Sequence, residues 1–287
     1  MKSKSMESIM KTIFFISATV SIIAIVLICI FIFAGGVPFI AEYGLKDFLL
    51  GREWQPSDTP ASFGILPMIT GSIYVTIGAI ILGVPIGILT ATYLAKFCNH
   101  KVYRFLKPCI NLMAGIPSIV YGFFALVVLV PIIRDIFGGT GMNIITASIL
   151  LGIMILPTIV NISESAIRAV PQSYYEGSIA LGASHERAII SVVLPAARSG
   201  ILSSVILGIG RAIGETMAVI LVAGNQARMP AGLTKGVRTL TTNIVMEMAY
   251  AADEHRQALI ATATVLFVFI LIINGTFLII KRRANNG

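Results

Sequence analysis

Long apolar runs without charged residues dominate the chain, and each is long enough to cross a bilayer once. Four of these runs contain no Asp, Glu, Lys or Arg, and two further apolar runs complete the set. A membrane-spanning helix needs about 20 mainly apolar residues. The pattern therefore predicts six transmembrane helices, at Thr12–Ala41, Gly71–Ala95, Pro108–Ile133, Met142–Ile162, Ile201–Val222 and Ala258–Ile280.

The composition agrees with this reading. Hydrophobic residues make up 56% of the 287, charged residues make up 12%, and the mean hydropathy is +0.92, far from the values of a soluble domain. Six spans leave no room for a separate soluble domain, so we expect an all-α membrane protein. The first apolar run is about twice as long as the core of a signal peptide, which predicts an uncleaved helix.

The distribution of Lys and Arg predicts the orientation. Segments 1–11, 96–107, 163–198 and 281–287 hold 13 of these residues, whereas segments 42–70, 134–141 and 223–257 hold 7. Because cytoplasmic loops are enriched in Lys and Arg, both termini are expected in the cytoplasm of a cell (inner) membrane protein. The net charge of +8 is then a topology signal and gives no reason to expect a nucleic-acid partner.

Cysteine and histidine show neither a pairing pattern nor the spacing of metal ligands. The three cysteines are expected as free thiols, because one lies in the bilayer and two lie at the reducing face. We expect no metal site and no cofactor in this chain. The residues concerned are Cys29, Cys98, Cys109, His100, His185 and His255.

The segments outside the spans carry two local predictions. Trp54, the only Trp, suits the membrane–water interface. Apolar residues at helical spacing from Val237 to Ala251, with Arg238, Asn243 and Glu247 between them, predict an amphipathic helix that lies on the membrane or caps the bundle. A ridge of small residues every four positions, from Gly200 to Ala212, could serve either packing within the chain or a subunit interface.

Arg211 and Glu215 are ionisable residues at membrane depth in the fifth predicted span. Their i, i+4 spacing predicts a direct pair on one helix face. Such residues are costly in lipid and usually face a bundle interior or a wet path. The Arg could attract an oxyanion along a substrate path, or the pair could be purely structural.

The segment between spans four and five carries a spaced motif. Glu176, Gly182, Leu194 and Pro195 stand at the spacing of Glu-Ala-Ala, three residues, Gly, nine residues, Ile-x-Leu-Pro, with Val192 in place of Ile. In this motif the chain resembles the permease subunits of ATP-binding-cassette (ABC) importers. The resemblance implies that residues 171–195 form coupling helices, which seat on a separate ATPase subunit.

Residues 171–195 are themselves typical of a compact helical projection that another subunit can bind, and we name this projection the knob. Pro171 opens a helix and Gly182 provides a turn between two short helices. Tyr174, Tyr175 and Ile189 are expected on its adhesive face.

Three more segments are similar to the phosphate importers of this family. They are 210–225 around Arg211, 63–67 before span two, and 115–122 in span three. The chain looks closer to the PstC type than to the PstA type, on the 54–67 stretch and the Glu-Thr-Met-Ala form at 215–218. The resemblance covers about residues 54–280.

The resemblance implies a type I (MetI-like) importer fold, with an N-terminal helix and outer loop at 1–66 and a transport domain at 67–287. It also implies a second permease (PstA type), two ATPase subunits (PstB type) and an external phosphate-binding protein (PstS type). Pathway residues would be Arg211, Glu215, Pro117 and Ser118. Residues that couple to the ATPase would be Tyr175, Glu176, Gly182, Leu194 and Pro195.

Other functions remain open at this point. Another oxyanion, such as molybdate or sulfate, would suit a buried Arg equally well. An ion-gradient-driven transporter would need inverted repeats and ionisable groups in several spans, and neither is visible. No Gly-Lys dipeptide occurs, so the chain has no phosphate-binding Walker A loop and any ATP is used by a partner. No cluster of nucleophile and base points to an enzyme.

Overall fold

Helices make up almost all of the molecule in the computed structural model, which describes the backbone of residues 2–286 and the side chains of 6–279. The only strands in this part of the chain form a two-stranded antiparallel hairpin that pairs Trp54 with Phe63 and Gln55 with Ser62. Short π-helical segments, named η, continue three of the helices. In chain order the elements are α1 Lys2–Tyr43, α2 Leu45–Leu50, β1 Trp54–Gln55, β2 Ser62–Phe63, α3 Leu66–Thr92, η1 Tyr93–Phe97, α4 His100–Gly115, α5 Ser118–Phe124, η2 Ala125–Leu129, α6 Val130–Phe137, α7 Ile144–Arg168, α8 Gln172–Ala180, α9 His185–Ala188, η3 Ile189–Val193, α10 Leu194–Ala196, α11 Arg198–Gly214, α12 Met217–Val222, α13 Leu240–Glu247 and α14 Asp253–Asn286.

Five helical segments are long and apolar enough to cross a membrane, and a bent pair of helices adds a sixth if the pair forms one span. The five are Met6–Tyr43, Leu66–Phe97, Ser118–Phe137, Ile144–Arg168 and Asp253–Ile279. The pair is His185–Ala196 with Arg198–Gly214, bent by 68°. The count agrees with the six predicted spans when the bent pair is taken as one span, but the third and fifth predicted spans are not continuous helices.

The third predicted span, Pro108–Ile133, is divided between two elements. Its first part belongs to α4, an amphipathic helix that also takes up most of the predicted loop 96–107. The helix ends because Ile116 precedes a proline and adopts an extended conformation. The spanning segment begins only at Ser118. The fifth predicted span, Ile201–Val222, is likewise broken at Glu215 and Thr216 between α11 and α12.

The core lies where α7 packs against α3 on one side and α11 on the other. The ridge of small residues on α11 makes the second contact. A methyl group added at Gly200 would come 2.3 Å from the Cβ of Ala166, and the Ser204 hydroxyl lies 2.7 Å from that of Ser163. This ridge therefore serves packing within the chain.

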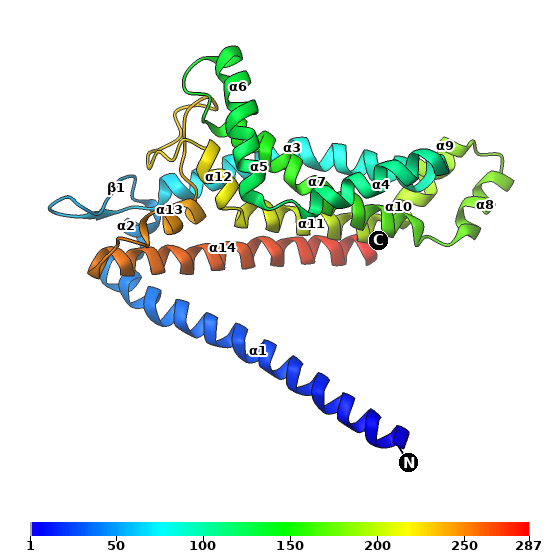
Figure 1. The fold of residues 1–287 in the computed structure, drawn as a ribbon, viewed down its shortest axis with the longest axis horizontal. Helices are drawn as coiled ribbons and strands as arrows, with labels where there is room; N and C mark the ends of the chain where they lie inside the picture. The colour runs from blue at the N-terminus through cyan, green and yellow to red at the C-terminus, as the bar shows by residue number, and fades with distance from the viewer. Residues whose placement is uncertain (1, 287) are drawn as a thin grey trace.

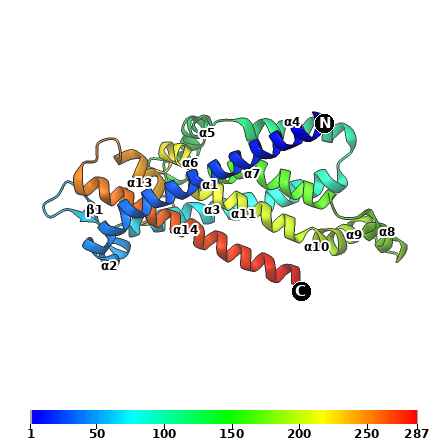
Figure 2. The same ribbon diagram turned by 90° about the horizontal axis from the view of Figure 1, so that it is seen from below.

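The loops and the chain ends gather at opposite ends of the molecule. Figures 1 and 2 show α2, β1 and α13 at one end, which we name the hairpin end. Both termini lie toward the other end, where α8 and α9 project; we name it the α8 end. This arrangement agrees with the prediction that the termini and segment 171–195 share one side of the membrane.

Trp54 is buried within the protein at the hairpin end, so its side chain faces neither lipid nor water. Its side chain is 5% exposed, and it packs on Phe63 in an aromatic cluster at the hairpin end. Its indole N–H donates to Glu247 at 2.8 Å. The partner explains the burial, because a buried indole N–H needs an acceptor.

The predicted amphipathic helix from Val237 to Ala251 is shorter than expected and caps the bundle. Only α13 is regular, and its polar residues Asn243 and Glu247 are buried. Arg238, just before the helix, hydrogen-bonds both of them. The polar side chains between the apolar positions thus face an internal ion pair and not water.

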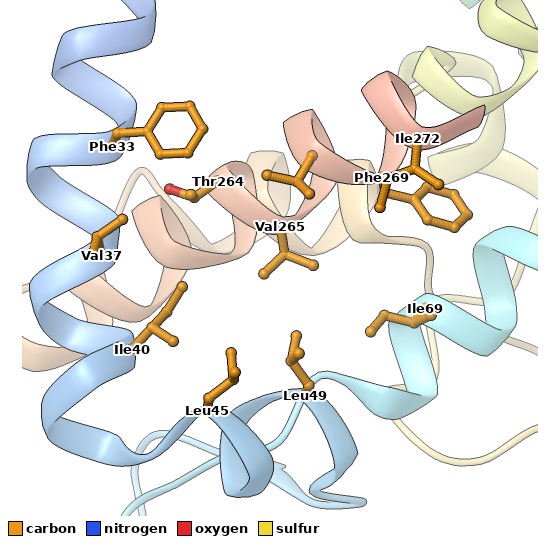
Figure 3. A pocket seen from close by; sticks show the side chains of 11 residues that line it. Phe33, Val37, Ile40, Leu45, Leu49, Ile69, Thr264, Val265, Phe269 and Ile272 are labelled. Carbon is orange, nitrogen blue, oxygen red and sulfur yellow. The ribbon is translucent and has the colours of Figure 1, made fainter. Parts of the chain in front are cut away.

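Helix α1 leaves the bundle as it runs toward its N-terminus (Figure 1). Its C-terminal half contacts α14, where the Thr264 hydroxyl donates to the Ile32 carbonyl at 3.0 Å. A pocket of about 490 Å³ lies between α1, α2, α3 and α14 (Figure 3). Every residue that lines it except Thr264 is apolar, so this pocket offers no charged group to an anion.

Candidate functional site

Two helix breaks lie in neighbouring elements in the middle of the molecule. One separates α4 from α5 at Ile116 and Pro117, and the other separates α11 from α12 at Glu215 and Thr216. The half-helices that follow, α5 and α12, pack together (Figure 1). A methyl group at Gly122 would come 2.8 Å from the Cα of Ala218, so only glycine permits this approach. Non-helical backbone at membrane depth is tolerated where protein buries it or where it lines a wet cavity.

Arg211 lies one turn before the second break. It is about 20 Å along the helix from Arg198, given 1.5 Å per residue, which places it well inside the span. Its side chain is half-buried, and its Nη1 lies 3.5 Å from the Thr158 hydroxyl of α7. Among the ion pairs of the described residues, none includes Arg211. A positive charge without a carboxylate at this depth can hold an anion.

The predicted pair between Arg211 and Glu215 is wrong. Glu215 does not lie on the helix face of Arg211, because α11 ends at Gly214 and Glu215 is extended. Its carboxylate accepts the backbone N–H of Ala218 at 3.2 Å, and its carbonyl accepts the Thr241 hydroxyl at 3.0 Å. Glu215 therefore satisfies the backbone at the break and leaves the Arg211 charge uncompensated.

Pro117 and Ser118 form the other break, as predicted for a broken helix in span three. Pro117 is the N-cap of α5 and is exposed, and Ser118 is half-buried at the first helical position. The Tyr121 hydroxyl donates to the Met113 carbonyl at 2.8 Å, which ties the two sides of this break together. The hydrogen bonds of the described residues join neither Pro117 nor Ser118 to Arg211.

The segment 171–195 forms the two short helices that the sequence predicted. Pro171 is the N-cap of α8, and Gly182 lies between α8 and α9 with φ of +86°, a conformation that favours glycine. Glu176 and Pro195 are exposed. Leu181 is 91% exposed, so an apolar side chain stands at the tip of the knob. An exposed apolar tip on a compact helical pair suits a protein partner.

The inner face of the knob differs from the predicted adhesive face. Ile189 is fully buried, and Leu194 is half-buried beside the core cluster at the α8 end of the helices. The Tyr175 hydroxyl lies 2.8 Å from His185 Nδ1, and the His185 ring packs edge-on against Phe97 at the end of η1. These residues hold the knob to the bundle, whereas Tyr174 faces outward.

Glu186 carries a charge on the exposed side of α9. Its own backbone N–H and the Ser184 hydroxyl hydrogen-bond to the carboxylate and hold its pKa below the ordinary value. Ser184 also caps the helix by accepting the backbone N–H of Arg187. Glu186 is therefore ionised on a surface that a partner can reach.

The sequence analysis did not predict the ion pairs of two buried carboxylates. Glu164, 2% exposed near the end of α7, is bound by Lys107 and Arg168, and Glu247 is bound by Arg238 and His255. The first had one local signal, since Glu164 and Arg168 have i, i+4 spacing, but the predicted span ended at Ile162. In the second, Arg238 and His255 lie 9 and 8 positions from Glu247, which is not the i, i+4 spacing of one helix face, and the third partner, Trp54, is 193 positions away.

Comparisons with known proteins identify the family. The model for "Binding-protein-dependent transport system inner membrane component" matches residues 83–286. The chain belongs to this family. It is therefore a multi-pass membrane protein and a permease of the ABC-importer type.

Individual relatives agree with this assignment. The permease is 39% identical to the probable ABC transporter permease protein YqgH of Bacillus subtilis over 81% of this chain and 76% of that protein. It is 31% identical to the phosphate transport system permease protein PstC of Mesorhizobium japonicum, over 91% of this chain and 86% of that one.

The fold has a solved counterpart. An inward-facing structure of the MetNI methionine ABC transporter matches with a TM-score of 0.59 and 20% identity, over 77% of this chain and 94% of that one. The predicted MetI-like importer fold is thus confirmed.

Proposed function

We propose that this permease imports inorganic phosphate. It forms the translocation path with a second permease of the PstA type and is driven by two ATPase subunits of the PstB type. An external binding protein of the PstS type delivers the phosphate. The observation that carries the proposal is the unpaired Arg211 between two broken helices, in a chain 31% identical to a PstC protein.

Arg211 supplies what a phosphate ion needs at this depth. Its guanidinium is always charged and presents a planar fork of donors that matches two phosphate oxygens. Because Glu215 is turned away to the backbone of α12, it does not neutralise that charge. The Thr158 hydroxyl beside the guanidinium offers a further hydrogen-bonding group. Pro117 and Ser118 are proposed as wall residues of the same path.

The knob at α8 and α9 is the proposed seat of the ATPase. Glu176, Gly182 and Pro195 lie on its accessible side, and Tyr175 and Leu194 brace it from within. The shared end of termini and knob, together with the Lys and Arg distribution, supports the cytoplasmic placement of both termini. Residues 67–287 form the transport domain, and 1–66 supply the first helix and outer loop.

The test is phosphate uptake by the complete transporter in vesicles, comparing the natural chain with Arg211→Gln. We expect uptake to fall by about 100-fold or more, because a charge-assisted contact of roughly 3 kcal/mol is lost. Arg134→Gln is the control, since Arg134 is exposed and pairs only with Asp135 beside it. Equal uptake by the Arg211→Gln and natural chains would make Arg211 structural.

The same vesicles distinguish phosphate from other oxyanions. Excess molybdate or sulfate should leave labelled phosphate uptake unchanged if phosphate is the substrate. If molybdate or sulfate is itself taken up faster than phosphate, the permease serves that oxyanion instead.

A further inference from the structure

Helix α4 is attached to the bundle mainly through polar contacts. None of its residues is fully buried, and its outward side chains Phe105 and Leu112 are more than two-thirds exposed. Tyr103, Leu106 and Ile110 pack only at the edge of a core cluster. A helix held this way can shift relative to its neighbours at little cost in buried apolar area.

The strongest of these contacts is centred on Glu164 of α7. The Lys107 ammonium of α4 donates to the Glu164 carboxylate at 2.7 Å and to the Asn161 side-chain oxygen at 2.7 Å. Arg168 donates to the other Glu164 oxygen at 2.8 Å. Because Glu164 is nearly inaccessible to solvent, this ionic contact is far stronger than a surface pair.

Glu164 lies next to the proposed ATPase seat. It stands one turn before Arg168, where α7 ends, and Pro171 then starts α8. The Arg168 guanidinium also donates to the Leu94 carbonyl in η1 at 2.8 Å, so the end of α7 is fixed to span two. Only Ala169 and Val170 separate the end of α7 from Pro171, so a displacement of the knob acts on the end of α7, and on Glu164, through a short connection.

The other end of α4 reaches the candidate path. Its Met113 carbonyl accepts the Tyr121 hydroxyl of α5 across the break at Pro117. Helix α5 packs against α12, which begins just after the break that follows Arg211. Helix α4 thus runs from the ionic contact at Glu164 to the break beside the pathway arginine.

We propose that the pair of Lys107 and Glu164 is the joint that transmits movement of the ATPase-bound knob to α4 and so opens or closes the path at Arg211. The inference rests on the proposed function of the permease. Lys107 and Glu164 are positioning residues, because they act on the path through α4 and Tyr121. Arg168 also lies over the Tyr103 ring at 4.8 Å, but its side chain is half exposed and this contact is weaker.

The variant that tests the joint is Lys107→Met in the complete transporter. It removes the ionic link from Glu164 to α4 but leaves Glu164 paired with Arg168, so no carboxylate is buried without a partner. We expect the ATPase to stay bound and ATP hydrolysis to persist, while phosphate carried per ATP falls by about tenfold, an ordinary size for coupling between two sites. Lys107→Arg should restore the ratio. Arg104→Met, on the exposed side of the same helix, should leave it unchanged.

A second readout does not depend on the substrate. Cys109 is exposed on α4 and can carry a spin label once the half-buried Cys29 and Cys98 are replaced by Ser. Adding ATP should change the label's mobility in the natural and Lys107→Arg chains but not in Lys107→Met.

The two readouts separate the two proposals. If the natural chain carries no phosphate but the label responds to ATP only when residue 107 is basic, the proposed substrate is wrong and the joint stands. A full label response or an unchanged transport ratio in Lys107→Met overturns the joint. Loss of ATPase binding in that variant also overturns it, because Lys107 would then be a folding residue.

Discussion

At the scale of single residues, the hairpin end depends on one buried carboxylate. Glu247 accepts the Trp54 indole and the His255 ring, both at 2.8 Å, and pairs with Arg238. These partners come from β1, the start of α14 and the loop before α13, so one side chain joins three segments. Removing it would leave Arg238 buried without its counter-charge.

Glu247→Ala should therefore destabilise the permease by about 3–5 kcal/mol, the usual cost of breaking a buried ion pair by removing one partner. Unfolding of the complete transporter in detergent, followed by heating or by denaturant, measures this loss. Glu254→Ala is the matched control, because Glu254 is exposed on the neighbouring helix. A loss no larger than that of the control would show that Glu247 does not hold this end together.

The same residues show why the ion pairs could not be predicted. Sequence spacing suggested Arg211 with Glu215, but a pair at i, i+4 needs a continuous helix, and the helix stops between them. The actual partners of Glu247 lie up to 193 positions away. Burial by distant segments decides which charges meet, and no local pattern encodes that burial.

At the scale of elements, the sequence predicted the continuous helices well and the broken ones poorly. Hydropathy cannot detect a break whose residues are themselves apolar, as at Gly115 and Ile116. Proline alone was also insufficient, since Pro85 and Pro157 remain inside α3 and α7 whereas Pro117 ends a helix. The break at Glu215 has no proline, and its carbonyl is satisfied by Thr241, 26 positions later.

The knob was predictable because its signals are local. The turn at Gly182 and the cap at Pro171 both follow from backbone preferences of the residues themselves. The buried position of Ile189 was not predictable, because it depends on how η3 packs against α8, which the local sequence does not show.

Glu176→Lys tests the knob as a docking element. Glu176 is exposed on α8, so reversing its charge should leave insertion and folding intact but strongly weaken binding of the ATPase. Co-purification of the tagged permease with its ATPase measures the effect. Glu254→Lys makes the same exchange at the hairpin end and should not change it. Normal co-purification of Glu176→Lys would remove this residue from the docking surface.

At the scale of the whole molecule, the proposed ATPase seat, the ion pair at Glu164 and the candidate path at Arg211 follow one another along the bundle. The knob and both termini lie at the α8 end, the unpaired Arg211 lies between the two broken helices, and the ion pair at Glu164 joins the end of α7 to α4. Broad apolar faces remain exposed on α1, α3 and the α5–α6 segment, as expected for surfaces that meet lipid or a second permease. The sequence contains no Gly-Lys dipeptide and so no Walker A loop, and in the proposed function the energy of ATP enters through the knob.

The central claim is that this chain is the membrane subunit of an importer and depends on a separate ATPase subunit. The direct measurement is labelled phosphate uptake into vesicles, with the chain alone or with the second permease, ATPase and binding protein, and with or without ATP. The account predicts uptake only in the complete transporter and only with ATP. Phosphate movement by the chain alone, driven by an ion gradient without ATP, would contradict it.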